Sequence, residues 1–261
     1  MTSVVKAVKR YGNSGGVYVP SKWIGGKVKV ELIEEPLDPR HVLARIPLEH
    51  VISAILYGSY ARKESLEGSD MDILLVVDDD SKISIAPELK QKYDIQIKSL
   101  RNLRNALVHD PVFYKIIKDE AVAILNHQFL DSLKKEAPKT IDIKKRIELA
   151  ESSLNITKEI LKIGGDIANL VYPLIMRLKE ILLIEYFLED KKYSTKALKH
   201  EILDCGITSK EFSLLMDIYR TSRNGKRIPK TLLSTDTITK ITLLLENKIQ
   251  YVKQKAREKR D

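Results

Sequence analysis

Two aspartates and a Gly-Ser pair are the residues whose types and spacing could support chemistry. Asp70 and Asp72 are separated by one residue at the start of an apolar run, and Gly58-Ser59 ends an earlier apolar run that begins at Val51. Because side chains alternate along a strand, both aspartates are expected on the same face. Converging carboxylates repel each other, and burying them is costly unless a cation lies between them. The spacing therefore predicts a divalent metal site, and the Gly58-Ser59 turn could hold a phosphate.

This order of Gly-Ser, ten residues and then Asp-x-Asp resembles the nucleotidyltransferase superfamily that includes DNA polymerase β. The segments 58–62 (GSYAR) and 69–72 (SDMD) are most similar to its minimal nucleotidyltransferase branch. The alternative is a β-hairpin with a glycine turn and two aspartates that face solvent. The resemblance implies that Asp70 and Asp72 hold Mg²⁺ (or Mn²⁺) and that ATP or another nucleoside triphosphate is the substrate.

The resemblance also implies a third carboxylate on a neighbouring strand, and Asp94 in segment 93–97 matches it. Asp94 would help to hold the metal and accept the proton of an attacking hydroxyl. Gly58 and Ser59 would bind the β- and γ-phosphates. Arg62 would be either a bidentate phosphate ligand or part of a structural ion pair.

Composition sets limits on the class of protein. A chain of 261 residues is long enough for about two domains. Its net charge of +9 is consistent with a polyanionic partner or a phosphate-rich ligand. The lone cysteine, Cys205, suits a reducing cytoplasm. The longest apolar stretch, residues 167–188, contains four charged residues, so no membrane span is expected, and the scattered histidines do not predict a zinc site.

Residues 1–36 are expected to form a separate β unit. Strands are predicted at residues 4–9, 17–20 and 27–32, with a turn at residues 12–16. About 35 residues bury too little surface to be stable alone, so the unit must pair with a copy of itself or dock elsewhere. Its order resembles the AbrB/SpoVT-type swapped hairpin, a dimeric DNA-binding unit. That resemblance implies a homodimer with possible DNA contacts at Lys6, Lys9, Arg10 and Asn13. The alternative is a basic dimerisation hairpin with a solvated face.

The rest of the chain is expected to contain a catalytic domain at residues 37–130 and a helical domain at 131–261. In the first, strands at 51–56, 70–77, 93–97 and 121–125 and a helix at 111–119 predict a small mixed sheet with flanking helices. In the second, apolar stripes at helical spacing predict an antiparallel bundle of four or five helices. The overall prediction is an α+β fold.

The helical domain resembles the substrate-binding bundles of kanamycin-type nucleotidyltransferases and the related HEPN proteins. HEPN ribonucleases carry a histidine shortly after an arginine, and none follows Arg220, so that activity is not expected. A basic cluster of Arg220, Arg223, Lys226 and Arg227 could bind an acidic substrate or nucleotide phosphates, or it could be a solvated loop.

Two functions follow. The first is an Mg²⁺-dependent nucleotidyltransferase that places a nucleoside monophosphate, AMP from ATP, on a hydroxyl of a small molecule or of a protein side chain. The second is a dimeric DNA-binding regulator or antitoxin whose transferase site is vestigial or subordinate. The site residues Gly58, Ser59, Asp70, Asp72 and Asp94 favour the first, and the basic segment at residues 4–30 favours the second.

Overall fold

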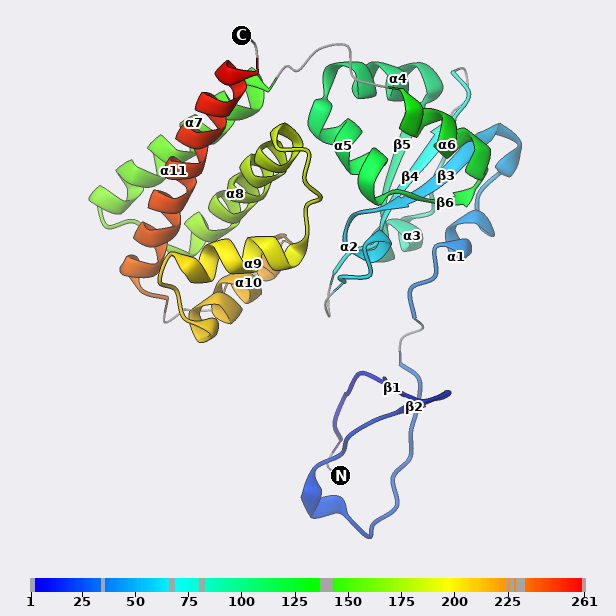
Figure 1. Ribbon diagram of the computed structural model, residues 1–261. Helices are drawn as coiled ribbons and strands as arrows, with labels where there is room; N and C mark the ends of the chain where they lie inside the picture. Colours follow the sequence, from blue (N-terminus) through cyan, green and yellow to red (C-terminus); the bar gives the residue numbers. More distant parts are fainter. Residues whose placement is uncertain are drawn as a thin grey trace. The chain divides into compact units, whose positions relative to one another are not determined.

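The computed structural model describes residues 3–33, 36–65, 69–79, 83–136, 143–223, 225, 228 and 233–259. The chain divides into two compact units, residues 1–37 and residues 38–261. The larger unit combines a small mixed sheet with flanking helices and a group of long helices (Figure 1). The predicted α+β class is therefore confirmed.

A four-stranded sheet has the order β5–β4–β3–β6. Strand β3 pairs antiparallel with both β4 and β6, whereas β4 and β5 are parallel. Strand β4 lies inside the sheet, and every residue of it after the first is buried, as its unbroken apolar sequence predicts. The strands are β3 (Val51–Tyr57), β4 (Asp72–Val77), β5 (Asp94–Ser99) and β6 (Val122–Leu125). Each matches an expected strand to within about two residues, but Asp70 precedes β4.

Three helices pack against one face of this sheet. Leu103, Ile117 and Leu130, one from each helix, belong to the same apolar core as Leu74 and Val76 of β4. Each helix begins with a side chain that accepts a hydrogen bond from a backbone N–H of its first turn, so an orphan donor is satisfied there. The helices are α4 (Leu100–His109), α5 (Pro111–Glu120) and α6 (His127–Lys135) (Figure 1).

Short helices connect the strands. The single turn α2 (Gly58–Ala61) follows β3 directly, and α3 (Pro87–Lys92) lies in the crossover from β4 to the parallel strand β5. The segment that enters the sheet contains α1 (Arg40–Leu43) and the 3-10 turn η2 (Leu48–His50). The turn at α2 therefore places the first residues after β3 beside the start of β4.

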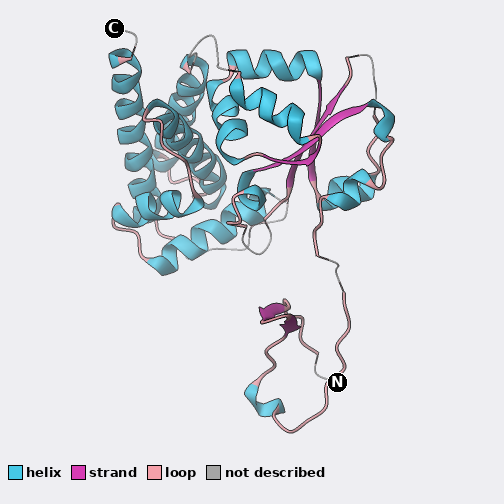
Figure 2. Ribbon diagram, turned by 45° about the vertical axis from the view of Figure 1, so that its right-hand side comes forward, coloured by secondary structure: helices cyan, strands magenta, loops and turns pink. Residues whose placement is uncertain are grey.

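The remaining helices form the predicted bundle. They share one apolar core, in which α8 contacts α7, α10 and α11. Figure 2, coloured by secondary structure, shows this part of the chain as helices joined by loops. Ser194 caps α9, and the buried stripe of α11 runs from Ile238 to Val252. Pro173 lies in the early turns of α8. The helices are α7 (Lys144–Lys162), α8 (Ala168–Leu188), α9 (Thr195–Asp204), α10 (Ser209–Arg223) and α11 (Thr235–Glu258).

The predicted boundary between the two larger domains, at residues 130 and 131, falls inside α6. Leu130 and Leu133 of α6 both belong to the core of the sheet. The segment from α6 to the first bundle helix includes residues 137–142, which lie outside the described residues, as do Pro138 and Thr140, where the composition suggested a boundary. None of the helices in the described ranges is long and apolar enough to cross a membrane.

The N-terminal unit contains less strand than expected. Its only strands among the described residues are β1 (Lys9–Tyr11) and β2 (Ser14–Gly16), which form a short antiparallel hairpin, followed by the 3-10 turn η1 (Ser21–Trp23). Residues 17–20 and 27–32, expected as strands, are irregular. The physical reason is that no described residue of the unit is buried, so a single copy offers the predicted strands neither a partner nor a core.

Candidate functional site

The sheet brings the three predicted carboxylates to one place. Asp72 is the first residue of β4 and lies opposite Tyr57 of β3 on one side and Asp94 of β5 on the other. The Asp94 N–H donates a hydrogen bond to the Met71 carbonyl at 3.1 Å. Directly paired residues of neighbouring strands point to the same face, so the Asp72 and Asp94 side chains are neighbours. Asp70 lies two residues before Asp72, on the segment that leads into β4.

Gly58 is required at the turn after β3. Its φ of +72° is in the left-handed region, and a Cβ built there would lie 2.2 Å from Oδ2 of Asp72. No larger residue fits unless the carboxylate moves. Ser59 follows in the same half-buried turn. The structure therefore places the predicted Gly58-Ser59 pair directly beside the carboxylates.

The carboxylates lie in an electrostatically strained environment. Burial, followed by the nearby charge of Asp94, raises the pKa of Asp72 to about 6. Burial also raises the pKa of the Tyr57 hydroxyl, and the charges of Asp72 and Asp94 add to this shift. The pKa shift of Asp72 therefore reflects both its burial and its repulsion by the neighbouring Asp94 carboxylate.

Two cations from the helical bundle offset part of this charge. Nη2 of Arg223, at the end of α10, lies 2.5 Å from Oδ2 of Asp70 and 3.9 Å from Oδ2 of Asp94. Lys179 of α8 acts on Asp72 in the same sense, because both cations lower the pKa of that carboxyl. Burial lowers the pKa of Lys179 itself, with a further contribution from Arg223.

The basic cluster expected at residues 220–227 is only partly described. Arg223 reaches the carboxylates, whereas Arg220 forms an ion pair of 2.6 Å with Asp217 on its own helix. Lys226 and Arg227 lie outside the described residues. The contact of Arg223 with Asp70 was not predicted, and the expected binding of an acidic substrate or of nucleotide phosphates stays a prediction.

Arg62 forms a buried ion pair. Its side chain is 16% exposed, its Nε lies 2.9 Å from Glu64, and its Nη1 contacts Glu120, which is only 5% exposed. Nη2 donates a hydrogen bond to the Thr195 hydroxyl at 3.3 Å, which links the turn to α9 of the bundle. Of the two predicted roles, this geometry favours the structural ion pair. Glu120 also accepts a hydrogen bond from the backbone N–H of Gly58. This N–H, which was predicted to donate to a phosphate, therefore already has a partner within the chain.

Sequence reasoning missed the part of the bundle that faces the carboxylates. Lys179 lies 5.4 Å from the ring centroid of Tyr219, and the Tyr219 ring stacks on Tyr172 with centroids 5.4 Å apart. The available signal was a charged residue inside the apolar stretch 167–188, which had been used only to exclude a membrane span. An ionisable group in a largely apolar helix needs a partner, and for Lys179 that partner includes Asp72.

The donor set fits a magnesium ion that arrives with a nucleotide. In the part of the chain that the structure describes, no three Asp, Glu, His or Cys side chains are gathered as a metal cage. Mg²⁺ usually keeps water ligands and is held by one or two carboxylates together with substrate phosphates. Asp70 and Asp72, with Asp94 alongside, supply such carboxylates at the edge of the Gly58 turn.

The predicted DNA-contact residues are all exposed. Lys6, Lys9, Arg10 and Asn13 lie on or next to the β1–β2 hairpin. Nε of Arg10 donates to the Gly12 carbonyl at 2.9 Å, which orients the arginine along the turn. The hairpin therefore presents basic side chains to solvent.

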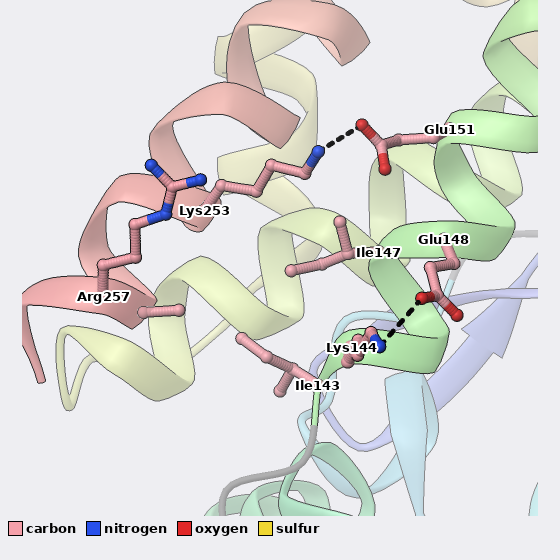
Figure 3. Close-up of a pocket in the computed structure, with 8 residues that line it drawn as sticks. Ile143, Lys144, Ile147, Glu148, Glu151, Lys253 and Arg257 are labelled. Atoms are coloured by element: carbon pink, nitrogen blue, oxygen red, sulfur yellow. Dashed lines mark hydrogen bonds and ion pairs between the residues drawn. The ribbon is translucent and has the colours of Figure 1, made fainter. Parts of the chain in front are cut away.

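Two surface grooves lie elsewhere in the bundle. One, of about 260 Å³, lies between the start of α7 and the end of α11, where Lys253 pairs with Glu151 and Lys144 with Glu148 (Figure 3). The other lies between α7 and α8 and includes Pro173. Neither is lined by a predicted site residue, and the charges of the first are largely paired with each other. The carboxylate cluster remains the best candidate site.

One comparison with known proteins bears on this assignment. A protein-family model, "Nucleotidyltransferase domain", matches residues 40–163. Similar solved structures include spectinomycin adenyltransferase AAD(9) from Enterococcus faecialis, determined with ATP and spectinomycin, at 13% identity and a TM-score of 0.38, covering 78% of this chain and 93% of that chain. A nucleotidyltransferase-like protein from Exiguobacterium sibiricum has 13% identity and a TM-score of 0.34, covering 78% and 70%. No curated protein matches. The family match supports the predicted enzyme class, a nucleotidyltransferase.

Proposed function

We propose that this nucleotidyltransferase domain transfers a nucleoside monophosphate, AMP from ATP, to a hydroxyl of a small molecule or of a protein side chain. The observation that carries the proposal is the group of Asp70, Asp72 and Asp94 beside Gly58, where a Cβ would displace the Asp72 carboxylate. Carboxylates placed this closely are costly for stability, and a cation–phosphate ligand gives them a function.

The roles follow from position. Asp70 and Asp72 would hold Mg²⁺ or Mn²⁺, which supplies neutralisation of the charge on the triphosphate. Ser59, in the turn next to Asp72, would contact the β- and γ-phosphates through its hydroxyl and N–H. Arg62 would fix the turn through Glu120 rather than bind phosphate. Gly58 would let the backbone approach the ligand closely.

The transfer itself needs an acceptor and a base. The acceptor oxygen forms a bond to the α-phosphorus, the bond to the pyrophosphate oxygen breaks, and Asp94 takes the acceptor proton. Asp94 is suited to this role because its side chain is 45% exposed and lies next to Asp72. Positioning and charge neutralisation carry most of the acceleration in such reactions.

The test uses the four α-labelled nucleoside triphosphates with Mg²⁺ and a panel of hydroxyl acceptors, including proteins. Asp72→Asn is expected to lower label transfer by at least about 100-fold, because a metal ligand is lost. Asp131→Asn, on the exposed side of α6, is the matched control and should transfer at the wild-type rate. Equal transfer by wild type and Asp72→Asn would refute the assignment.

A second candidate function is DNA binding by a homodimer of the N-terminal unit. The observation that favours it is the absence of any buried residue among those described in residues 1–37, together with exposed apolar side chains such as Val30, which is 66% exposed. An apolar surface of this kind needs a partner, and a second copy of the unit would supply one. Exposed Lys6, Lys9 and Arg10 would then contact DNA phosphates.

Two measurements test this candidate. Val30→Asp should abolish concentration-dependent self-association in sedimentation if the unit dimerises through its apolar side chains. Replacing Lys6, Lys9 and Arg10 with glutamine should weaken DNA binding and reduce the slope of log K against log salt by about 2 to 3. An unchanged slope would show that these residues do not contact phosphates.

Cys205, the lone cysteine, fits the expectation of a reducing compartment such as the cytoplasm.

A further inference from the structure

The end of α10 is held firmly at the carboxylate site. Tyr219, one turn before Arg223, stacks on Tyr172 of α8 with an interplanar angle of 17° and lies under the Lys179 ammonium. At the other end, Thr208 and Glu211 cap the helix through reciprocal hydrogen bonds, and Glu211 also accepts a hydrogen bond from Thr237 of α11 at 2.7 Å. These contacts hold both ends of α10 in place, so the backbone of Arg223 is fixed beside Asp70.

Arg223 and a metal ion would compete for the same carboxylate, that of Asp70. Nη2 of Arg223 lies 2.5 Å from Oδ2 of Asp70, the carboxylate that the proposed function assigns to the metal. A guanidinium ion that occupies a carboxylate oxygen removes part of its capacity to coordinate a cation. The same guanidinium is well suited to phosphate oxygens, which it can bind through two N–H groups.

We propose that Arg223 exchanges partners, binding Asp70 in the nucleotide-free enzyme and the triphosphate when the metal–nucleotide complex binds. The inference rests on the proposed function of Asp70 and Asp72. It makes metal and nucleotide binding mutually supportive, because the nucleotide draws Arg223 away from the carboxylate that the metal needs. The free metal alone binds weakly, and the enzyme takes up metal and nucleotide together.

Lys179 is the cation that stays in place during this exchange. Its ammonium is held over the Tyr219 ring at 5.4 Å and lies within the electrostatic reach of Asp72. The long, half-exposed side chain of Arg223, in contrast, sits at the last turn of α10 and can change rotamer without disturbing that packing. The two cations therefore have different roles, one fixed and one exchangeable.

The test measures Mn²⁺ binding to the full chain by electron paramagnetic resonance, with and without a non-hydrolysable ATP analogue. Arg223→Gln is expected to bind Mn²⁺ alone about two- to fivefold more tightly, the scale of a partly exposed ion pair. It should bind the analogue, with Mn²⁺ present, about tenfold more weakly, because a charged hydrogen bond to phosphate is lost. Lys210→Gln removes one charge from the exposed start of the same helix and should change neither affinity.

Arg223→Lys separates charge from geometry. A lysine restores the positive charge beside Asp70, so Mn²⁺ alone should bind as weakly as in wild type, but it cannot bind phosphate through two parallel N–H groups, so only part of the analogue affinity should return. Thermal unfolding of each variant, within about 2 °C of wild type, shows that the fold is retained.

Either of two results for Arg223→Gln overturns the exchange. Tighter or unchanged analogue binding by Arg223→Gln, or weaker or unchanged Mn²⁺ binding in the absence of the analogue, each contradicts it. Asp72→Asn, measured in parallel, tests the underlying site. If Asp72→Asn leaves Mn²⁺ affinity unchanged in both conditions, the proposed function fails and the exchange fails with it. If Asp72→Asn removes Mn²⁺ binding while Arg223→Gln changes nothing, only the exchange is refuted.

Discussion

Substitution of Gly58 by alanine tests the geometry of the site most directly. Two separate costs arise. The φ of +72° is unfavourable for any residue with a Cβ, by about 1–2 kcal/mol. In addition, the new Cβ would lie 2.2 Å from Oδ2 of Asp72, so that the carboxylate must withdraw by about 1 Å to reach ordinary contact distance. The first cost affects stability, whereas the second affects the ligand itself.

Gly206→Ala is the matched control. Gly206 has a φ of +82°, and a Cβ there would meet nothing within 4 Å, so this variant has the backbone cost without the collision. In urea denaturation we expect Gly206→Ala to lose about 1–2 kcal/mol and Gly58→Ala to lose more. Gly206→Ala should transfer label at the wild-type rate, whereas Gly58→Ala should lose about 100-fold, since a displacement of 1 Å at the reacting groups has effects of that order.

The affinity for Mn²⁺ with a non-hydrolysable ATP analogue provides a second readout that needs no acceptor. Gly58→Ala should bind this pair at least about tenfold more weakly than Gly206→Ala does. The reasoning is refuted if the two alanine variants have the same affinity and the same transfer rate. That result would mean that Asp72 tolerates a Cβ at its side and that its position is not critical.

Three further predictions concern stability. Arg62→Met should lower the free energy of unfolding by about 3–5 kcal/mol, because it leaves the buried Glu120 carboxylate unpaired. The double variant Arg62→Met with Glu120→Gln should lose less unfolding free energy than Arg62→Met alone. Equal losses of the two variants in urea denaturation would argue against the ion pair. Hydrogen bonds from Thr208 lower the pKa of Glu211 from 4.5 to about 2, so the ionised Glu211 side chain stabilises the fold above pH 4.5. The difference in unfolding free energy between wild type and Glu211→Gln should therefore shrink as the pH falls from 4.5 to about 2. A constant difference would contradict this. Leu245→Ala, in the centre of the bundle core, should lose about 2–5 kcal/mol in the same assay, and a loss below 1 kcal/mol would show that α11 is not packed as described.

Local patterns were enough to predict the four strands, helix α5 and the helical bundle of the larger unit, whereas helices α4 and α6 were not predicted. The Asp-x-Asp spacing and the alternation around Asp94 are properties of single strands, and the strand pairing then brings Asp72 and Asp94 together. The bundle helices were also predictable, because their apolar stripes recur at helical spacing. In each case the information lies within about twenty residues of sequence.

The cation side of the site could not be predicted in the same way. Contact between Arg223 and Asp70, or between Arg62 and Glu120, depends on how distant segments pack, and a basic residue near a helix end has many possible partners. In the N-terminal unit, by contrast, the local patterns predicted a strand that the single chain does not form. Its strand patterns are local and clear, but residues 27–33 form no strand in the single chain, where no described residue of the unit is buried.

Arg223 lies at the end of α10, the helix before the final one, and this late position in the chain matters during synthesis of the protein. About 150 residues separate Asp72 from Arg223, and a ribosome adding roughly 5–20 residues per second needs about 8–30 s to synthesise them. N-terminal segments fold first, so the sheet can form with its carboxylates in place before the arginine has been translated. On the growing chain, the acidic edge is therefore exposed to cellular cations for several seconds, and the control that Arg223 exerts on metal binding begins only when α10 has emerged and packed.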